Sequence, residues 1–282
     1  MIGAFVPSWN IHIAQTERLL ARTGAVARTV VDRNAFLFGN LVPDIYVGYM
    51  VPGIQHPIAY RITHVAKPEH IPKPREWEFW NTYVAPLAER LGISCKTPRS
   101  GAERPILASS LHIEQDYVSR CHYPQRYMDA KPPVWQGCTA DADLSREALD
   151  ASVFDMVLGA WAHLVADNLW NTRVNEFLDA HGGKPSEAFR IKKQGDFDLF
   201  GKALPIDLVP RATPRLIAAA AAFPQYPIEE QPVLLSVGVA HETVRTNHGT
   251  PDPRYELLTT DFFEHVFAEA LDHTETLLEE RL

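Results

Sequence analysis

His163 and Asp167 stand four residues apart in an apolar stretch, residues 158–171, which reads LGAWAHLVADNLWN. In an α-helix this spacing puts both side chains on one face, about one turn apart, so the imidazole and the carboxylate can hold one metal ion or bridge two. Two strongly polar groups among apolar neighbours carry a desolvation cost that a bound ion would offset. The alternative interpretation is a His–Asp hydrogen bond that closes an interface between helices.

Three more candidate metal ligands, His12, Asp44 and His64, come from other segments of the chain. Together with His163 and Asp167 they offer imidazole nitrogens and carboxylate oxygens but no thiolate. This donor set suits Zn²⁺, and nearly as well Mn²⁺, iron or another divalent ion. A divalent ion would make hydroxide available near neutral pH, which is the chemistry of metal-dependent hydrolases. No G-x-S-x-G, phosphate-binding loop or dinucleotide motif competes with this interpretation.

Capping residues and turn signals predict the helices that must position these side chains. A first helix is expected from Trp9 to Thr23, between Ser8 as N-cap and Gly24 as its end, with His12 in its first turn. The longest helix is expected to begin after Asp143 or Ser145, to bend near residues 171–172 and to end at Gly182-Gly183. Further helices are predicted over residues 33–38, 76–91, 105–120, 185–204, 214–223, 233–246 and 260–281.

Two of the candidate ligands are expected on irregular segments. Pro43 disfavours helix at the residue before it, so Asp44 is predicted on a loop beside a helix end. The proline-rich residues 46–75 predict a loop that carries His56, His64 and His70. Alternating strand patterns are lacking, and we therefore predict an all-α multi-helix bundle that forms a single domain over residues 1–282.

Composition limits the classes of partner. The chain has 282 residues, of which 46% are hydrophobic and 22% charged, and a formal net charge of −8 without a Lys/Arg block. We expect no nucleic-acid partner, no membrane span and no secretory signal peptide. Three cysteines without a C-x-x-C spacing indicate free thiols in a reducing compartment, so we predict a cytoplasmic protein. No feature predicts the oligomeric state.

The order of four motifs resembles the zinc-dependent phospholipase C family, including its little-described bacterial branch. The motifs are His12, the segment GNLVPD ending at Asp44, ITH ending at His64, and H-x-x-x-D from His163 to Asp167, and the likeness covers about the first 200 residues. The resemblance implies a helical protein that binds up to three zinc ions and hydrolyses a small-molecule or lipid phosphate ester with a metal-activated water. Asp44, His64 and His163 would hold one zinc, Asp167 would bridge, and His12 would help to hold a second. Asp44 is also the candidate general base.

The chain departs from that family's pattern in two places. The family uses an N-terminal Trp to supply backbone zinc ligands, whereas Trp9 is internal. Asn171 and Arg173 stand where the family has a further His. Side chains that could still complete the site are His265, Glu269, Asp261, Asp196 and Asp198, although each also fits a solvated surface. We therefore expect one or two metal ions, with Asn40, Asn168 and Asn171 as candidates to orient the ligands.

Two alternatives to the hydrolase interpretation stay open. A metal phosphohydrolase of the HD type is also helical and based on His and Asp, but the sequence lacks an adjacent His-Asp pair. A non-catalytic protein that holds one structural metal is the other alternative. A closed shell of four protein ligands would favour the structural metal, and an open coordination position would favour catalysis.

Overall fold

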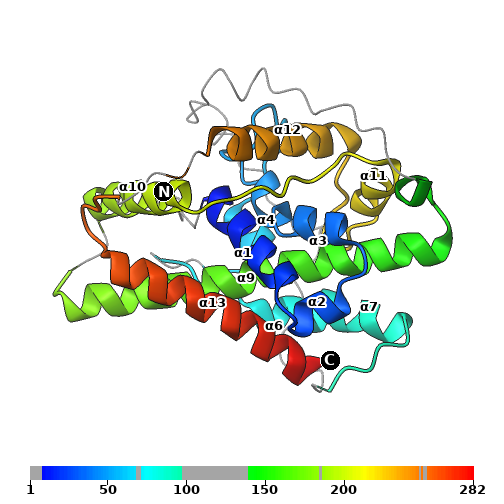
Figure 1. The fold of residues 1–282 in the computed structure, drawn as a ribbon, viewed down its shortest axis with the longest axis horizontal. Helices are drawn as coiled ribbons and strands as arrows, with labels where there is room; N and C mark the ends of the chain where they lie inside the picture. The colour runs from blue at the N-terminus through cyan, green and yellow to red at the C-terminus, as the bar shows by residue number, and fades with distance from the viewer. Residues whose placement is uncertain (1–7, 68–70, 97–138, 184–185, 248, 250–252) are drawn as a thin grey trace.

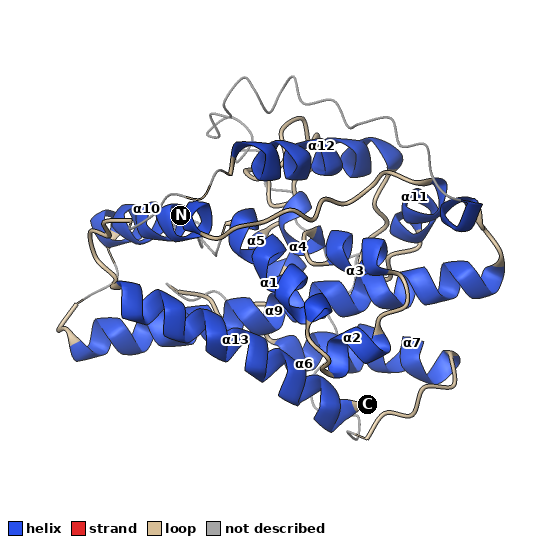
Figure 2. Cartoon of the chain, viewed as in Figure 1, coloured by secondary structure: helices blue, strands red, loops and turns tan. Residues whose placement is uncertain are grey.

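The computed structural model describes residues 8–67, 71–96, 139–183, 186–247, 249 and 253–282 (Figure 1). Throughout these ranges the regular elements are helices, apart from isolated bridge residues such as the antiparallel pair Ala66 and Pro74 (Figure 2). The all-α prediction is confirmed. His70, the linker-like residues 97–103 and the helix predicted over residues 105–120 lie outside the described ranges.

The helical elements follow one another along the chain with only short connections in many places. In chain order they are α1 (Trp9–Ala21), α2 (Ala25–Thr29), α3 (Arg33–Gly39), α4 (Val42–Ile45), α5 (Tyr60–Thr63), α6 (Glu76–Phe79), a π-helical turn (Trp80–Val84), α7 (Ala85–Arg90), a 3₁₀ turn (Thr139–Ala142), α9 (Arg146–Ala180), α10 (Glu187–Ala203), α11 (Pro214–Ala221), α12 (Glu230–Thr246) and α13 (Thr260–Arg281).

Helix α9 is the axis of the fold, and α3, α11 and α13 pack against it (Figure 1). The hydroxyl of its N-cap, Ser145, accepts from the Ala148 N–H. Gly182 ends the helix with φ 64°, and the Gly183 N–H returns to the Leu178 carbonyl at 2.9 Å. Its 35 residues run without a break through the position where a bend was predicted, and span about 50 Å.

The expectation that no segment is long enough for a membrane span needs correction at α9. By length and composition alone this helix could cross a bilayer. In the fold, 78% of its most apolar window is buried inside the protein, and Trp161 and Trp170 are both fully covered. A core helix of this length passes the same test because it is apolar on all sides.

Two local predictions in the N-terminal region are wrong in detail. Gly24 has φ −82° and forms the N-cap of α2, so it does not end α1 in a left-handed conformation. Pro43 lies in the first turn of α4, where its missing N–H needs no partner, and Asp44 is therefore helical and not on a loop. The predicted helix over residues 76–91 runs without a break from Glu76 to Arg90, with a π-helical turn from Trp80 to Val84 inside it. His64 and His56 lie outside helices, as predicted.

Two glycines set the distance between α3 and α9. A Cβ atom on Gly39 would overlap the carbonyl oxygen of Met156, and one on Gly159 would overlap that of Phe36. The two backbones can therefore approach more closely than larger residues would allow. This contact brings the end of α3 directly against α9, beside His163.

Candidate metal centre

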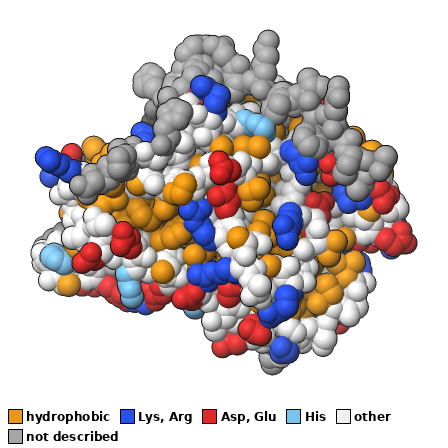
Figure 3. Space-filling view, viewed as in Figure 1, with side chains coloured by type: hydrophobic (Ala, Val, Ile, Leu, Met, Phe, Trp, Pro, Cys, Tyr) orange, Lys and Arg blue, Asp and Glu red, His pale blue; other side chains and the backbone are white. Residues whose placement is uncertain are grey.

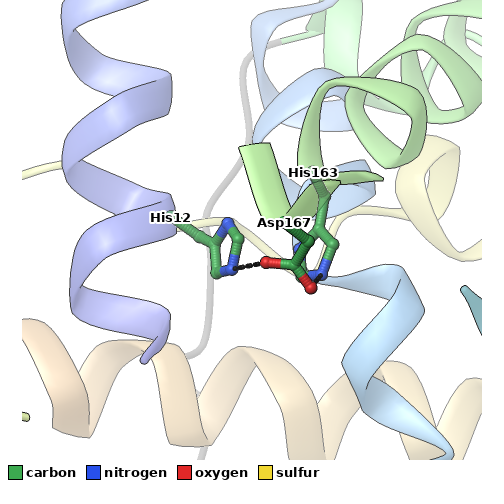
Figure 4. Close-up of side chains that lie close together, drawn as sticks. All are labelled: His12, His163 and Asp167. Atoms are coloured by element: carbon green, nitrogen blue, oxygen red, sulfur yellow. Dashed lines mark ion pairs between the residues drawn. The ribbon is translucent and has the colours of Figure 1, made fainter. Parts of the chain in front are cut away.

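The five predicted ligands converge in the interior of the molecule. His12 comes from α1, Asp44 from α4, and His163 and Asp167 from α9, while His64 directly follows α5. All five have 0% exposure, so none belongs to the surface of mixed apolar, acidic and basic side chains in Figure 3. Figure 4 shows His12 pointing from α1 toward Asp167 and His163 on α9.

Donor atoms of four residues cluster around the Nε2 atoms of His64 and His163. The Nε2 atoms of His64 and His163 are 3.1 Å apart, and Asp167 Oδ2 lies 3.4 Å from His163 Nε2 and 3.6 Å from His64 Nε2. Asp44 Oδ1 lies 3.5 Å from His64 Nε2. Two ligand atoms on one tetrahedral zinc are separated by about 3.3 Å, because each lies about 2.0–2.1 Å from the metal. We call Asp44, His64, His163 and Asp167 the four-donor group.

The second oxygen of Asp167 faces a different partner. His12 Nε2 lies 3.4 Å from Asp167 Oδ1, and the His12 ring stacks on the His163 ring at 3.9 Å between centroids (Figure 4). The two carboxylate oxygens of Asp167 therefore point at separate sets of nitrogen atoms. This is the arrangement in which one carboxylate can bridge two metal ions.

Hydrogen bonds at the far side of each ring fix the tautomers of His163 and His64. His163 Nδ1 lies 2.8 Å from the Asn40 carbonyl, which can only accept, so Nδ1 carries the proton. The Thr63 hydroxyl donates to the Tyr60 carbonyl at 3.3 Å and can accept from His64 Nδ1 at 2.8 Å. Both Nε2 atoms then present lone pairs to the same point, which requires a cation or a shared proton between them.

Among the residues that the structure describes, the buried carboxylates of Asp44 and Asp167 have no permanent positive partner. Asp44 Oδ2 accepts from the Trp9 indole N–H at 3.2 Å, and Asp167 Oδ2 accepts from the Tyr60 hydroxyl at 3.3 Å. Within the described ranges, no Lys or Arg side chain contacts either carboxylate. Buried charges of this kind need compensation, which a divalent cation or a protonated imidazole can supply.

The three buried histidines differ in the direction of their pKa shifts. Burial lowers the pKa of His12 and that of His64, so both rings favour the neutral form that binds metal. Burial also opposes the charging of His163, but Asp167 and Asp44 outweigh it and raise the His163 pKa. Without a metal, His163 is therefore the ring that would hold the compensating proton.

The carboxyl and phenol beside these rings shift in opposite directions. Although burial alone raises the pKa of Asp167, the charge of His163 and the hydrogen bond of His12 hold it well below its usual range. Burial and the Asp167 charge raise the pKa of Tyr60 well above its usual value. The Asp167 carboxylate stays charged, and the Tyr60 hydroxyl stays protonated as a donor to it.

Several of these ligand atoms have no hydrogen-bond partner among the described residues. They are His12 Nδ1 and Nε2, Asp44 Oδ1 and Asp167 Oδ1, and each is fully buried. Native proteins rarely leave buried polar atoms unpaired unless an ion or water binds there. Since three of the four are atoms that would face a metal, the residues present fit a divalent cation. Across the described ranges, the groups that could hold an ion are His12, His163 and Asp167, and Asp44, His64 and His163.

The other side chains that could have completed the site form other contacts or are exposed. Asp196 accepts three backbone N–H bonds, at 2.7 to 2.9 Å, from residues 256–258, and so anchors the segment before α13. Arg173 donates through Nε to Glu269 at 2.8 Å and pairs with its second oxygen, while His265 is exposed. Asp198 accepts from the Gln194 side chain at 3.0 Å.

The three asparagines have different tasks. Asn40 orients His163 through its backbone carbonyl, and its side chain donates to the Gly159 carbonyl at 3.3 Å. Asn168 and Asn171 donate to the carbonyls of Pro74 and Pro72, at 2.6 and 2.9 Å, and so fix that segment to α9. Only Asn40 contacts a candidate ligand.

Sequence reasoning missed the contacts that hold the ligands in place. Trp9, Tyr60 and Thr63 each bond to a ligand side chain, and Tyr60 also stacks on the His64 ring at 3.7 Å between centroids. Their residue types carry no metal signal. Closeness in sequence, with Trp9 three residues before His12 and Tyr60 four before His64, was the available hint.

No protein family model, curated protein or solved structure matches the chain. Function must therefore be inferred from the geometry of the centre and from the order of its motifs.

Proposed function

We propose that the protein is a zinc-dependent hydrolase of phosphate esters, of the phospholipase C type, that uses a metal-activated water. The observation that carries this proposal is the Asp167 carboxylate, whose two oxygens face two different sets of donors. Paired metal ions that share a carboxylate are a recurrent arrangement in enzymes that cleave phosphate esters.

The two sides of the centre would have different tasks. The four-donor group offers a complete set of protein ligands for one ion. On the other side, His12 and the second oxygen of Asp167 face each other, with His163 as the third residue of that group, which leaves coordination positions for water and substrate. When bound, zinc would lower the pKa of a coordinated water and neutralise charge that develops on a phosphoryl oxygen.

The surrounding residues orient the ligands. One oxygen of Asp44 accepts from the Trp9 indole N–H, and the other faces His64. We therefore assign Asp44 to metal binding and not to proton transfer. Tyr60 donates to Asp167 and stacks on His64, which holds both side chains at their observed angles. The Asn40 carbonyl keeps the His163 proton on Nδ1 and leaves Nε2 as the ligand atom.

A structural metal site is the second candidate function. His64 has three donor atoms 3.1 to 3.6 Å from its Nε2, all from residues with 0% exposure, and a set of four buried donors is typical of a closed site that stabilises the fold. In that case one ion would bind and no hydrolysis would follow.

Stepwise zinc titration of metal-free protein separates the two functions. We expect the first equivalent to raise the Tm, and hydrolysis of bis(p-nitrophenyl) phosphate, p-nitrophenyl phosphate or phosphatidylcholine vesicles to appear with the second. A rise in Tm that saturates at one equivalent, with no hydrolysis of any of the three substrates, would support the structural metal instead.

A further inference from the structure

Gln15 is a second kind of unpartnered group beside the metal centre. Its side chain is fully buried in α1, and neither its Nε2 nor its Oε1 has a hydrogen-bond partner in the part of the chain that the structure describes. A carboxamide can make up to four hydrogen bonds, and burying it with none is costly. Thr16, the neighbouring buried polar residue, avoids this cost by donating to the His12 carbonyl at 2.9 Å.

The helix places Gln15 beside His12. The two residues are three positions apart on α1, so their Cβ atoms are about 5–6 Å apart and lie within about 60° of each other around the axis. His12 points from this face of α1 toward Asp167 (Figure 4). Gln15 therefore lies one turn along the helix from His12, on a similar face of α1.

The chemistry of Gln15 fits an oxygen-rich ligand. Its amide N–H groups can donate to a phosphoryl oxygen, and its carbonyl can accept from a protonated phosphate oxygen or a water. A neutral carboxamide is suited to this task, because it adds no charge to a centre that already holds two buried carboxylates. A Lys or Arg at the same position would instead compete with a metal ion for Asp167.

We propose that Gln15 binds a phosphoryl oxygen of the ligand held on the His12 side of the centre. This inference depends on the proposed function and names the residue that would recognise its substrate class. Gln15 donates through Nε2 to the phosphoryl group, and the ligand satisfies the buried carboxamide that the described residues leave unpaired.

The test compares inorganic phosphate binding to zinc-loaded wild type and to Gln15→Met by calorimetry. Methionine keeps the length of the side chain but removes both polar atoms. We expect phosphate affinity to fall about tenfold or more, the loss of a hydrogen bond to a charged group, with unchanged zinc content. Thermal unfolding of the metal-free proteins should show Gln15→Met at least as stable as wild type, because an unpaired buried amide is gone.

Ser8→Ala is the matched control. The Ser8 hydroxyl is also buried at the start of α1 without a partner among the described residues, but it packs against Gly201 of α10. We expect this variant to bind phosphate as wild type does. If Gln15→Met loses zinc, Gln15→Asn, which keeps the amide but shortens its reach, supplies the same comparison.

Two results overturn the inference in distinguishable ways. Equal phosphate affinity in wild type and Gln15→Met, together with zinc-dependent ester hydrolysis by wild type, would remove the role of Gln15 and leave the proposed function standing. Absence of both phosphate binding and hydrolysis in zinc-loaded wild type would overturn the proposed function and the inference together.

Discussion

Two ionic clusters lie along α9, one partly buried and one fully buried, and they differ in how their charges are compensated. In the first, Arg281 donates to both oxygens of Glu76, at 2.6 and 3.0 Å, and the Trp161 indole donates to Glu76 at 2.9 Å. The Arg281 guanidinium also lies over three indole rings, 5.2 to 5.4 Å from their centroids. No buried polar atom of Glu76, Arg281 or Trp161 lacks a partner.

In the candidate metal centre, by contrast, the described residues do not compensate the buried negative charges. Asp44 and Asp167 are fully buried without a contact to a described Lys or Arg, and one oxygen of each lacks a hydrogen-bond partner among the described residues. A cluster that serves stability brings its own countercharge, as Glu76 and Arg281 do. This contrast supports our proposal that the candidate metal centre binds a cation from outside the chain.

The largest effect is expected when the negative charge of Asp167 is removed. Asp167→Asn keeps the volume of the side chain, and we expect zinc affinity to fall more than about 100-fold, beyond the 10–100-fold loss typical of residues that only orient ligands. His163→Ala should behave likewise in competition titrations with a zinc chelator. His181→Ala, an exposed residue at the end of the same helix, is the control, and a matching loss there would contradict the assignment.

The next largest effect is expected when the ion pair between Glu76 and Arg281 is broken. Glu76→Gln leaves the Arg281 charge largely buried without its partner, and we expect a loss of about 3–5 kcal/mol in the free energy of unfolding. Zinc affinity should not change. Urea unfolding combined with zinc titration checks both statements, and loss of zinc from the folded variant would mean that the two clusters are coupled.

A smaller effect is expected where the fold holds the centre in place. Gly159→Ala would force α3 away from α9, and we expect a loss of about 1–3 kcal/mol in stability. It would also displace the Asn40 carbonyl from His163, and zinc affinity should fall about 10–100-fold. Gly195→Ala on α10, where a Cβ meets no atom within 4 Å, is the matched control. Unchanged zinc affinity in a folded Gly159→Ala would show that this contact does not position His163.

Asp155 is a third buried carboxylate, and its charge is only partly compensated by the described residues. Its Oδ2 accepts from the backbone N–H groups of Val31 and Asp32, at 2.9 and 2.6 Å, while its buried Oδ1 is unpaired. Burial raises its pKa to about 7. Because the folded state binds this proton more tightly than the unfolded chain, the group lowers stability as pH rises from about 4 to about 7.

Asp155→Asn should abolish that loss. We expect it to be more stable than wild type by up to about 4 kcal/mol at pH 8, and similar to wild type at pH 4, because the pKa is raised by about three units and one pKa unit corresponds to about 1.4 kcal/mol. Urea unfolding at the two pH values measures the difference. Parallel pH profiles for the two proteins would show that Asp155 is not the responsible group.

The sequence predicted well those features that depend on local signals. Ser145 and Gly182 bound α9 as expected, because a cap and a left-handed glycine act within one turn. The five candidate ligands were predicted from residue type and motif order, and the fold brings all five together. Asp44 was misplaced because a proline signals a helix break and a first helical turn equally well.

Features that depend on packing between distant segments could not be predicted. The contact of Gly39 and Gly159 places Asn40 against His163, although the two glycines are far apart in sequence. Arg173 on α9 forms an ion pair with Glu269 on α13, and no pattern within α13 predicts this contact. The unpaired amide of Gln15 also emerged only with the fold, since its burial depends on every helix around α1.

The most direct test of the central claim is elemental analysis of wild-type protein, purified without chelators and then loaded with zinc and desalted. We predict one to two tightly held zinc ions per chain, with a Tm that falls when they are removed. Protein that is free of metal as purified, and that retains no zinc after loading, would contradict the claim and make the His163–Asp167 pair a hydrogen-bonded element of the core.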